Sequence, residues 1–371
     1  MNREPRIIIS GGGTGGHIFP AISIANEIKR VSPGAEILFV GALGKMEMER
    51  VPAAGYKIEG LPVAGLRRKL SLSNLLLPFK VLRSVRKAGK ILDEFKPDAV
   101  VGVGGYASAP LLWMAGNKKI PYLIQEQNSY AGLTNRILAK RAGIICVAYD
   151  GMGKFFPEEK ILITGNPVRE GIKMTTPKMK LEGRKHFGIA AGKKVLLVTG
   201  GSLGARTLNS AVQEWIKTHA ECDMDIIWQT GKFYKEEIDH FVAGNPREWV
   251  KNFAFIDRMD LAFASADVII TRAGAGTISE LSIAKKACIF VPSPMVAEDH
   301  QTHNARSLVD KGAALMVKDH EAHQYLMSTA AELITDPQRI EELEEKIGHM
   351  GYKDSASVIV HELFKLTGGR E

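Results

Sequence analysis

Gly11-Gly12-Gly13-Thr14-Gly15-Gly16-His17 follows a β-branched run at residues 6–9 and precedes a stretch with helical periodicity. A second sequence of the same kind, Gly200-Gly201-Ser202-Leu203-Gly204-Ala205, follows the apolar run 195–198 and also precedes a helix-like stretch. A strand, a turn without side chains and a helix together direct free backbone N–H groups and the positive end of a helix at an anion. Because this unit occurs twice, we expect two similar α/β lobes, with the active site in the cleft between them.

Strand-like runs alternate with helix-like stretches along the chain, as is typical of parallel sheets with helices on both faces. The predicted strands are residues 6–10, 36–40, 99–103, 122–125, 143–147 and 160–164, then 194–199, 225–229, 250–255, 268–271, 287–291 and 314–317. The polar, proline-bearing stretch 165–177 is the predicted hinge. We therefore expect an α/β fold of two Rossmann-like, doubly wound lobes. The N-terminal lobe would be residues 1–168 and the C-terminal lobe 169–349, with a helix at about 350–371 packing back on the first lobe.

Composition limits the class of protein. The 371 residues are 45% hydrophobic and 24% charged, which is typical of soluble globular proteins with room for two domains. Cys146, Cys222 and Cys288 show no disulfide or metal-ligand spacing, so they are predicted to be reduced core residues. No signal-peptide apolar region precedes the first strand. The uncharged stretch 99–117 contains several glycines and a proline, so it is predicted to form a strand, a loop and a short helix instead of a membrane span.

Basic charge is concentrated in the first half of the chain. Residues 1–170 carry a net charge of +10 and residues 171–371 one of −2, within a total of +8. In residues 61–96, basic and apolar side chains are interleaved, which suits anionic lipid headgroups; a solvated helix face is the alternative. Nucleic acid is not expected as a partner, because no aromatic platform or binding-helix motif accompanies the charge. The residues predicted to contact a membrane are Arg67, Arg68, Lys69, Leu75, Leu76, Phe79, Lys80, Arg83 and Arg86.

Glycine-rich and polar motifs follow the predicted strands, where ligands bind to doubly wound sheets. In order they are Gly13-Thr14-Gly15-Gly16-His17-Ile18-Phe19-Pro20, Gly104-Gly105-Tyr106-Ala107-Ser108, Glu126-Gln127-Asn128, Gly132-Leu133-Thr134-Asn135, Gly165-Asn166-Pro167-Val168-Arg169, the second glycine-rich sequence quoted above, Arg272-Ala273-Gly274-Ala275-Gly276-Thr277-Ile278-Ser279-Glu280 and Glu298-Asp299-His300-Gln301-Thr302-His303-Asn304-Ala305. This ordered set resembles the MurG family of bacterial glycosyltransferases over nearly the whole chain.

The resemblance implies a two-lobed (GT-B type) hexosyltransferase that needs no metal or other cofactor. Such an enzyme transfers N-acetylglucosamine from UDP-N-acetylglucosamine, with inversion, to the C4 hydroxyl of the muramyl sugar of polyprenyl-linked lipid I. The product is lipid II, for peptidoglycan and cell wall synthesis. The resemblance also implies peripheral attachment to the cytoplasmic face of the bacterial inner membrane, with the lipid acceptor on the N-terminal lobe and the UDP-sugar on the C-terminal lobe.

Residue chemistry on the C-terminal lobe fits a sugar nucleotide. Ala275-Gly276-Thr277 opens a helix that can hold a diphosphate without a metal, and Ser202 adds a hydroxyl donor. Glu280 can accept both ribose hydroxyls, although Thr277-x-x-Glu280 is also a capping box. By the resemblance, the backbone of Ile256 contacts uracil; a core role is its alternative. The predicted UDP-N-acetylglucosamine-binding residues are Thr14, Gly15, Gly16, Asn128, Arg169, Ser202, Ile256, Ala275, Gly276, Thr277, Ile278, Ser279, Glu280 and Gln301, with Arg272 a weaker phosphate partner.

The N-terminal lobe is predicted to hold the acceptor and the base. Backbone at Gly13, Gly104, Gly105 and Tyr106 can approach a lipid diphosphate closely, although glycines there also suit plain tight turns. His17 opens a helix whose positive end disfavours imidazolium, and a neutral imidazole can take a proton from an attacking hydroxyl. A structural or phosphate-binding histidine is the alternative role. Glu126 is the rival base.

The same sequence also bears on other kinds of enzyme and on binding proteins. Asp223-Met224-Asp225 has the Asp-x-Asp pattern of metal-dependent transferases, but it precedes a strand and so lies at the wrong edge of the sheet. A UDP-sugar enzyme with another lipid acceptor and a UDP-N-acetylglucosamine 2-epimerase remain alternatives. A dinucleotide-binding oxidoreductase needs an acidic residue after the second strand, whereas Glu36 precedes that strand. A non-catalytic nucleotide-binding module would not need His17.

Overall fold

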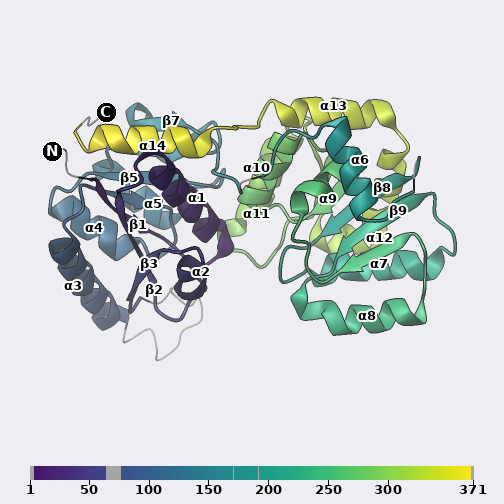
Figure 1. Ribbon diagram of the computed structural model, residues 1–371, viewed down its shortest axis with the longest axis horizontal. Coiled ribbons are helices and arrows are strands. Elements are labelled where there is room, and N and C mark those ends of the chain that lie inside the picture. The colour runs from purple at the N-terminus through teal and green to yellow at the C-terminus, as the bar shows by residue number, and fades with distance from the viewer. Residues whose placement is uncertain (1–3, 64–76, 170, 191, 369–371) are drawn as a thin grey trace. The chain divides into compact units, whose positions relative to one another are not determined.

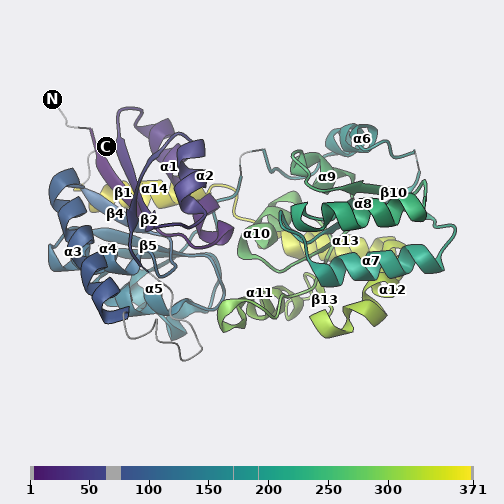
Figure 2. The same ribbon diagram turned by 90° about the horizontal axis from the view of Figure 1, so that it is seen from below.

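The computed structural model describes residues 4–63, 77–169, 171–190 and 192–368. The chain forms two compact units (Figures 1 and 2). The N-terminal unit consists of Met1–Glu170 and Tyr352–Glu371, and the C-terminal unit of Gly171–Gly351. Each unit contains one parallel sheet with helices on both faces.

The N-terminal unit contains a seven-stranded sheet in the order β3-β2-β1-β4-β5-β6-β7. Its strands are β1 (Arg6–Ser10), β2 (Glu36–Ala42), β3 (Lys57–Leu61), β4 (Ala99–Gly102), β5 (Tyr122–Glu126), β6 (Ile144–Val147) and β7 (Ile161–Ile163). Its α-helices are α1 (Gly15–Val31), α2 (Glu47–Ala53), α3 (Leu77–Phe95), α4 (Ala109–Asn117), α5 (Leu133–Leu138) and α14 (Ser355–Leu366), with 3₁₀ turns at Ala139–Arg141, Met152–Lys154 and Glu158–Lys160.

Strand β1 lies inside the sheet between β2 and β4, and its side chains alternate between two hydrophobic cores. Ile8 faces the core that contains Ile91 and Leu92 of α3. Ile7 and Ile9 face the opposite core, to which α1 and the C-terminal helix α14 contribute. Burial on both faces makes β1 a near-continuous β-branched run, which is the pattern expected of a parallel strand with helices on both sides.

The C-terminal unit contains a six-stranded sheet in the order β10-β9-β8-β11-β12-β13. Its strands are β8 (Lys194–Thr199), β9 (Met224–Gln229), β10 (Val250–Phe253), β11 (Val268–Thr271), β12 (Cys288–Phe290) and β13 (Leu315–Met316). Its α-helices are α6 (Pro177–His186), α7 (Arg206–Thr218), α8 (Lys235–Gly244), α9 (Met259–Ser265), α10 (Ala275–Ala284), α11 (His300–Val309), α12 (Ala322–Ile334) and α13 (Pro337–Gly348), with 3₁₀ turns at Lys232–Tyr234, Ala297–Asp299 and Asp319–Glu321.

Both sheets reverse their strand order beside their first strand, between β1 and β4 and between β8 and β11. In doubly wound sheets this switch point is where ligands bind, beyond the carboxyl ends of the strands. Each of the two glycine-rich turns follows one of these first strands, so the two sheets present equivalent sites. The predicted fold class is confirmed.

Strand β3 was not predicted from the sequence. It pairs with β2 alone at the edge of the sheet, and its Lys57 and Glu59 are exposed. An edge strand with two charges and Gly60 lacks the apolar run by which the other strands were predicted. Cys146 and Cys288 are free and buried as predicted, whereas Cys222 is only half-buried.

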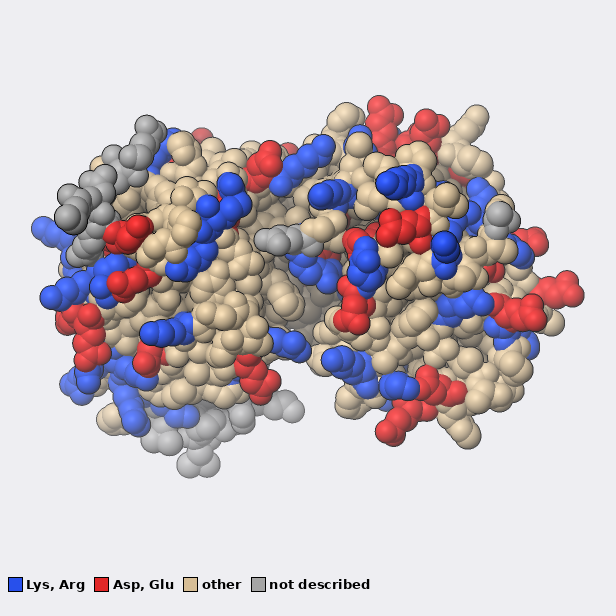
Figure 3. Space-filling view, in the orientation of Figure 1, with Lys and Arg blue, Asp and Glu red and all other residues tan. Residues whose placement is uncertain are grey.

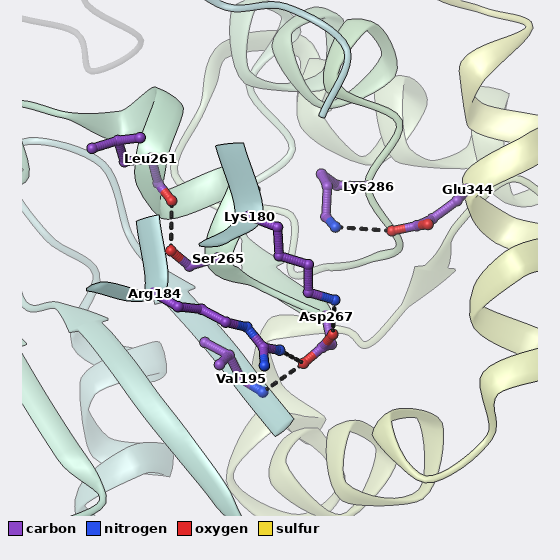
Figure 4. A network of polar contacts seen from close by, with 8 residues as sticks. All are labelled: Lys180, Arg184, Val195, Leu261, Ser265, Asp267, Lys286 and Glu344. Carbon is purple, nitrogen blue, oxygen red and sulfur yellow. Dashed lines mark hydrogen bonds and ion pairs between the residues drawn. The ribbon is translucent and has the colours of Figure 1, made fainter. Parts of the chain in front are cut away.

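A buried carboxylate at the amino edge of the second sheet holds α6 in place (Figure 4). Asp267 accepts hydrogen bonds from Lys180 Nζ at 2.6 Å, Arg184 Nη2 at 3.0 Å and the backbone N–H of Val195 at 2.8 Å. Since Lys180 and Arg184 lie one turn apart on α6, the contact ties that helix to β8. This network therefore stabilises the C-terminal unit at the edge opposite to its switch point.

No helix within the described ranges has both the length and the apolar character needed to cross a lipid bilayer. Residues 99–117 form β4, a loop and α4, as predicted.

Candidate functional site

On the N-terminal unit, the predicted acceptor residues converge around His17. Gly104 and Gly105 follow β4 and have φ angles of +90° and +78°, which side chains rarely adopt. A Cβ on Gly105 would lie 2.6 Å from the carbonyl oxygen of Gly12, and one on Gly104 would lie 3.2 Å from the His17 ring. The two glycines therefore allow the β4 turn to approach both the first glycine-rich turn and the imidazole.

The contacts of His17 Nδ1 favour one tautomer of the neutral ring. Nδ1 lies 3.1 Å from the carbonyl oxygen of Gly12 and 3.3 Å from Thr14 Oγ1. A carbonyl oxygen can only accept, so the Gly12 contact assigns the proton of the neutral ring to Nδ1. Nε2 then carries the lone pair that a general base needs, on the side of the ring next to Gly104.

Glu126, the rival base, uses both of its oxygens within its own loop. Oε1 accepts the backbone N–H and side-chain amide of Asn128 at 3.0 and 3.3 Å, and Oε2 accepts Gly132 N–H at 3.1 Å and Asn135 Nδ2 at 2.9 Å. Burial raises the pKa of this carboxyl, while the four donors oppose that rise. With 2% of its surface exposed, Glu126 is placed to hold the loop that carries Asn128.

A second buried carboxylate at this site, Glu47, was not predicted from the sequence. Its Oε2 accepts the backbone N–H of Gly13 and its Oε1 that of Ala42, both at 3.0 Å. Burial first and the charge of Glu47 second raise the pKa of the Tyr106 phenol, so this carboxylate also lies near a predicted acceptor residue. Nothing in the polar sequence around Glu47 distinguishes it from a surface glutamate.

On the C-terminal unit, α10 begins at Ala275 as predicted, directly beyond β11. Its first N–H groups have no partners within the helix, and a Cβ on Gly276 would meet no atom within 4 Å. The helix start is therefore open to a ligand.

The capping-box alternative for Glu280 is wrong. The N-cap is Gly274 and makes no side-chain capping bond, so Thr277 is the third helical residue and Glu280 the sixth. Glu280 is 6% exposed, one turn further into α10 than a capping glutamate would be.

Ile256 is 4% exposed, and its backbone N–H donates to Gln229 Oε1 at 2.9 Å. Gln229 in turn donates to Thr199 at the end of β8. Because the backbone N–H of Ile256 already donates to Gln229, the backbone carbonyl of Ile256 is the group that could accept a hydrogen bond from uracil. Gln229 is a second residue that the sequence did not reveal, and it fixes the predicted uracil loop to the sheet.

The structure also shows the contacts or exposure of three further residues that were predicted to bind UDP-N-acetylglucosamine or its phosphates. Gln301 accepts the backbone N–H of Ser293 at 2.8 Å through Oε1, which closes the loop before α11. Arg272 pairs with Asp319 and donates to the carbonyl of Val291, so it joins the end of β12 to a neighbouring turn. Arg169 is exposed near the end of the first segment of the N-terminal unit.

The predicted UDP-N-acetylglucosamine residues are divided between the two units. Thr14, Gly15, Gly16, Asn128 and Arg169 belong to the N-terminal unit, together with the predicted acceptor residues and His17. Those of the C-terminal unit are Ser202, Ile256, Ala275, Gly276, Thr277, Ile278, Ser279, Glu280 and Gln301.

The predicted membrane residues fall partly on α3. Phe79 is 72% exposed, and Lys80, Arg83 and Arg86 are also exposed. The opposite face of α3 is buried in the core through residues such as Ile91. Figure 3 shows basic side chains over the region of α3, with acidic ones among them. Arg67, Arg68, Lys69, Leu75 and Leu76 lie outside the described residues.

The Asp223-Met224-Asp225 sequence lies at the amino end of β9, at the edge of the sheet where it was predicted. Burial raises the pKa of Asp225. Within residues 4–63, 77–169, 171–190 and 192–368, no group of three His, Cys, Asp or Glu side chains is arranged to hold a metal ion.

Two doubly wound parallel sheets, each with a glycine-rich turn at its switch point, form the GT-B fold of glycosyltransferases. Residues 7–146 match the glycosyltransferase family 28 N-terminal domain, and residues 195–359 match the glycosyltransferase family 28 C-terminal domain. The chain therefore belongs to glycosyltransferase family 28.

Individual proteins of known sequence or structure also resemble the chain. The chain is 53% identical over 367 residues to the "UDP-N-acetylglucosamine--N-acetylmuramyl-(pentapeptide) pyrophosphoryl-undecaprenol N-acetylglucosamine transferase" of Phocaeicola vulgatus, covering 99% of this chain and 97% of that one. The crystal structure of Acinetobacter baumannii MurG matches with a TM-score of 0.77 and 29% identity, over 97% and 99% of the two chains. A UDP-GlcNAc 2-epimerase from Neisseria meningitidis matches over 98% and 100%, with a TM-score of 0.65 and 14% identity, which shows a shared fold alone.

Proposed function

We propose that the protein transfers N-acetylglucosamine from UDP-N-acetylglucosamine to the C4 hydroxyl of the muramyl sugar of undecaprenyl-pyrophosphoryl-linked lipid I, giving lipid II. The observation that carries the proposal is the 53% identity with the transferase of Phocaeicola vulgatus over 99% of this chain. The epimerase alternative rests on a structural likeness at 14% identity. A likeness at that level shows a shared fold and does not support a shared reaction.

The donor binds mainly to the C-terminal unit in this proposal. The open start of α10 receives the diphosphate, because unpaired N–H groups and the helix dipole favour an anion there. Glu280 accepts the ribose hydroxyls, and the carbonyl of Ile256 accepts from the uracil ring. Since the helix supplies the positive potential, the diphosphate needs no metal ion.

The acceptor binds to the N-terminal unit, beside the turn at Gly104 and Gly105. His17 Nε2 takes the proton of the C4 hydroxyl while the hydroxyl oxygen forms a bond to the anomeric carbon of N-acetylglucosamine. The bond from that carbon to the diphosphate breaks, and UDP leaves with the electron pair. A single displacement of this kind inverts the configuration at the anomeric carbon.

Membrane attachment is peripheral in this proposal, at the cytoplasmic face of the bacterial inner membrane. Exposed Phe79 together with Lys80, Arg83 and Arg86 on α3 supports contact with anionic headgroups. A lipid-linked acceptor would then reach a unit that already lies at the membrane surface.

An acceptor-dependence assay tests the proposed function. The protein is incubated with UDP-N-acetylglucosamine, with and without a lipid I analogue, and released UDP is measured. We expect UDP release and a glycosylated acceptor only when the analogue is present. Interconversion of N-acetylglucosamine and N-acetylmannosamine without an acceptor would support the epimerase instead, and a lack of turnover with both substrates would refute the transferase.

A further inference from the structure

We propose that Glu47 is a positioning residue for proton transfer, because it holds the peptide group that fixes the His17 imidazole. This inference rests on the proposed function only in taking His17 as the base. It concerns a side chain that is 1% exposed and begins α2.

Glu47 and His17 hold opposite ends of one peptide group. The Gly12 carbonyl and the Gly13 N–H belong to the same planar unit, which rotates as a rigid body. Glu47 Oε2 accepts from Gly13 N–H at 3.0 Å, while His17 Nδ1 lies 3.1 Å from the Gly12 oxygen. An anchored N–H end therefore keeps the carbonyl directed at Nδ1.

The surroundings of Glu47 show that the turn is shaped around its carboxylate. A Cβ on Gly12 would overlap the carboxylate oxygens, and a Cβ on Gly41 would lie 2.6 Å from Cγ of Glu47. The second oxygen is anchored to β2 through Ala42 N–H at 3.0 Å. Glu47 thus connects the turn after β1 to the end of the neighbouring strand.

Loss of this anchor has a consequence that a purely structural role would not have. Gly12 and Gly13, with φ angles of +152° and +89°, have no side chain to keep their shared peptide in place. If the peptide rotates, its carbonyl no longer accepts from Nδ1, and the imidazole is free to carry its proton on Nε2. In that tautomer the lone pair lies on Nδ1, so Nε2 cannot accept the proton of the acceptor hydroxyl.

The test compares Glu47→Gln with Asp98→Asn in the full chain. Glutamine keeps the size of the side chain but has one acceptor oxygen for two N–H groups. Asp98 is the matched control, because Oδ2 accepts the N–H of Arg6 at 2.8 Å at the other end of the same strand, β1. Measurements are kcat, UDP affinity, the melting temperature and the imidazole ¹⁵N signals of His17, assigned by their absence in His17→Asn.

We expect Glu47→Gln to lower kcat roughly 10- to 100-fold, as misplacement of a reacting group does. The ¹⁵N signals should shift toward the tautomer with the proton on Nε2, UDP affinity should stay unchanged, and Asp98→Asn should change neither kcat nor the signals. If Glu47→Gln does not fold, Glu47→Asp, which withdraws the carboxylate by one methylene, is measured in the same way.

Unchanged kcat and unchanged His17 signals in a folded Glu47 variant would overturn the inference and leave Glu47 a structural residue. Failure of the proposed function gives a different result. In that case the wild type has no transferase activity, while the His17 signals still report whether Glu47 fixes the ring.

Discussion

Replacement of His17 by asparagine is the substitution that most sharply separates catalysis from binding. The amide nitrogen of asparagine can take the place of Nδ1, which lies 3.1 Å from the Gly12 oxygen, so the turn keeps its hydrogen bond. The position of Nε2 is left without a base. Loss of a positioned base typically lowers the rate about 10²- to 10⁴-fold, or about 3–5 kcal/mol in activation free energy. We expect a loss of kcat in this range.

Donor affinity should stay nearly unchanged in His17→Asn, because most predicted donor contacts belong to the C-terminal unit. Transfer is measured by UDP release with a lipid I analogue, and UDP binding by calorimetry. In the pH profile of the wild type, kcat should fall at acidic pH, because imidazolium has no lone pair to accept a proton. This acidic fall in kcat should be absent in the variant. His349→Asn, at an exposed position after α13, is the matched control. A variant that keeps more than about a tenth of the wild-type kcat would refute His17 as the base, and Glu126 would be tested next.

The remaining predictions concern the donor, metal ions, the membrane and pH. Glu280→Ala should weaken UDP-sugar binding by about 1.5–3 kcal/mol, as for a hydrogen bond to a charged group; equal affinities by calorimetry would exclude it as a ligand. Activity should persist in excess EDTA, and a collapse restored by Mg²⁺ or Mn²⁺ would refute the helix-dipole account. Neutralising Lys80, Arg83 and Arg86 should weaken binding to anionic vesicles roughly fivefold per charge, and equal binding by sedimentation would assign α3 to ordinary surface. Burial raises the pKa of Tyr122 to about 12 from 10.0, so stability should be full below about pH 10 and fall by up to about 3 kcal/mol as the pH rises toward 12; urea unfolding should show this component missing in Tyr122→Phe.

The sequence was sufficient for features that depend on local pattern. Strands such as β1 and β8 were predicted because burial on both faces demands an unbroken apolar run, and both glycine-rich turns lie where that pattern placed them. Edge strand β3 was missed because exposed Lys57 and Glu59 remove the apolar signal. The motif order also identified the family.

Features that depend on distant backbone groups could not be predicted. Glu47 accepts the N–H of Gly13, 34 residues away, and Gln229 accepts the N–H of Ile256. Neither contact can be predicted from the residues that surround Glu47 or Gln229 in the sequence. The sequence left a capping box at Thr277 and Glu280 open as an alternative, which the structure excludes because the helix begins earlier, after Gly274. A Thr-x-x-Glu pattern has the same letters whether its first residue is the N-cap or lies inside the helix.

The most direct test of the central claim is the structure of the product that the wild-type protein forms from UDP-N-acetylglucosamine and a lipid I analogue. The new disaccharide is isolated and its linkage and anomeric configuration are determined by NMR. The account predicts a β-linked N-acetylglucosamine on the C4 oxygen of the muramyl sugar, because a single displacement inverts the α-linked donor. An α linkage, attachment at another hydroxyl, or modified sugar without an acceptor would contradict it.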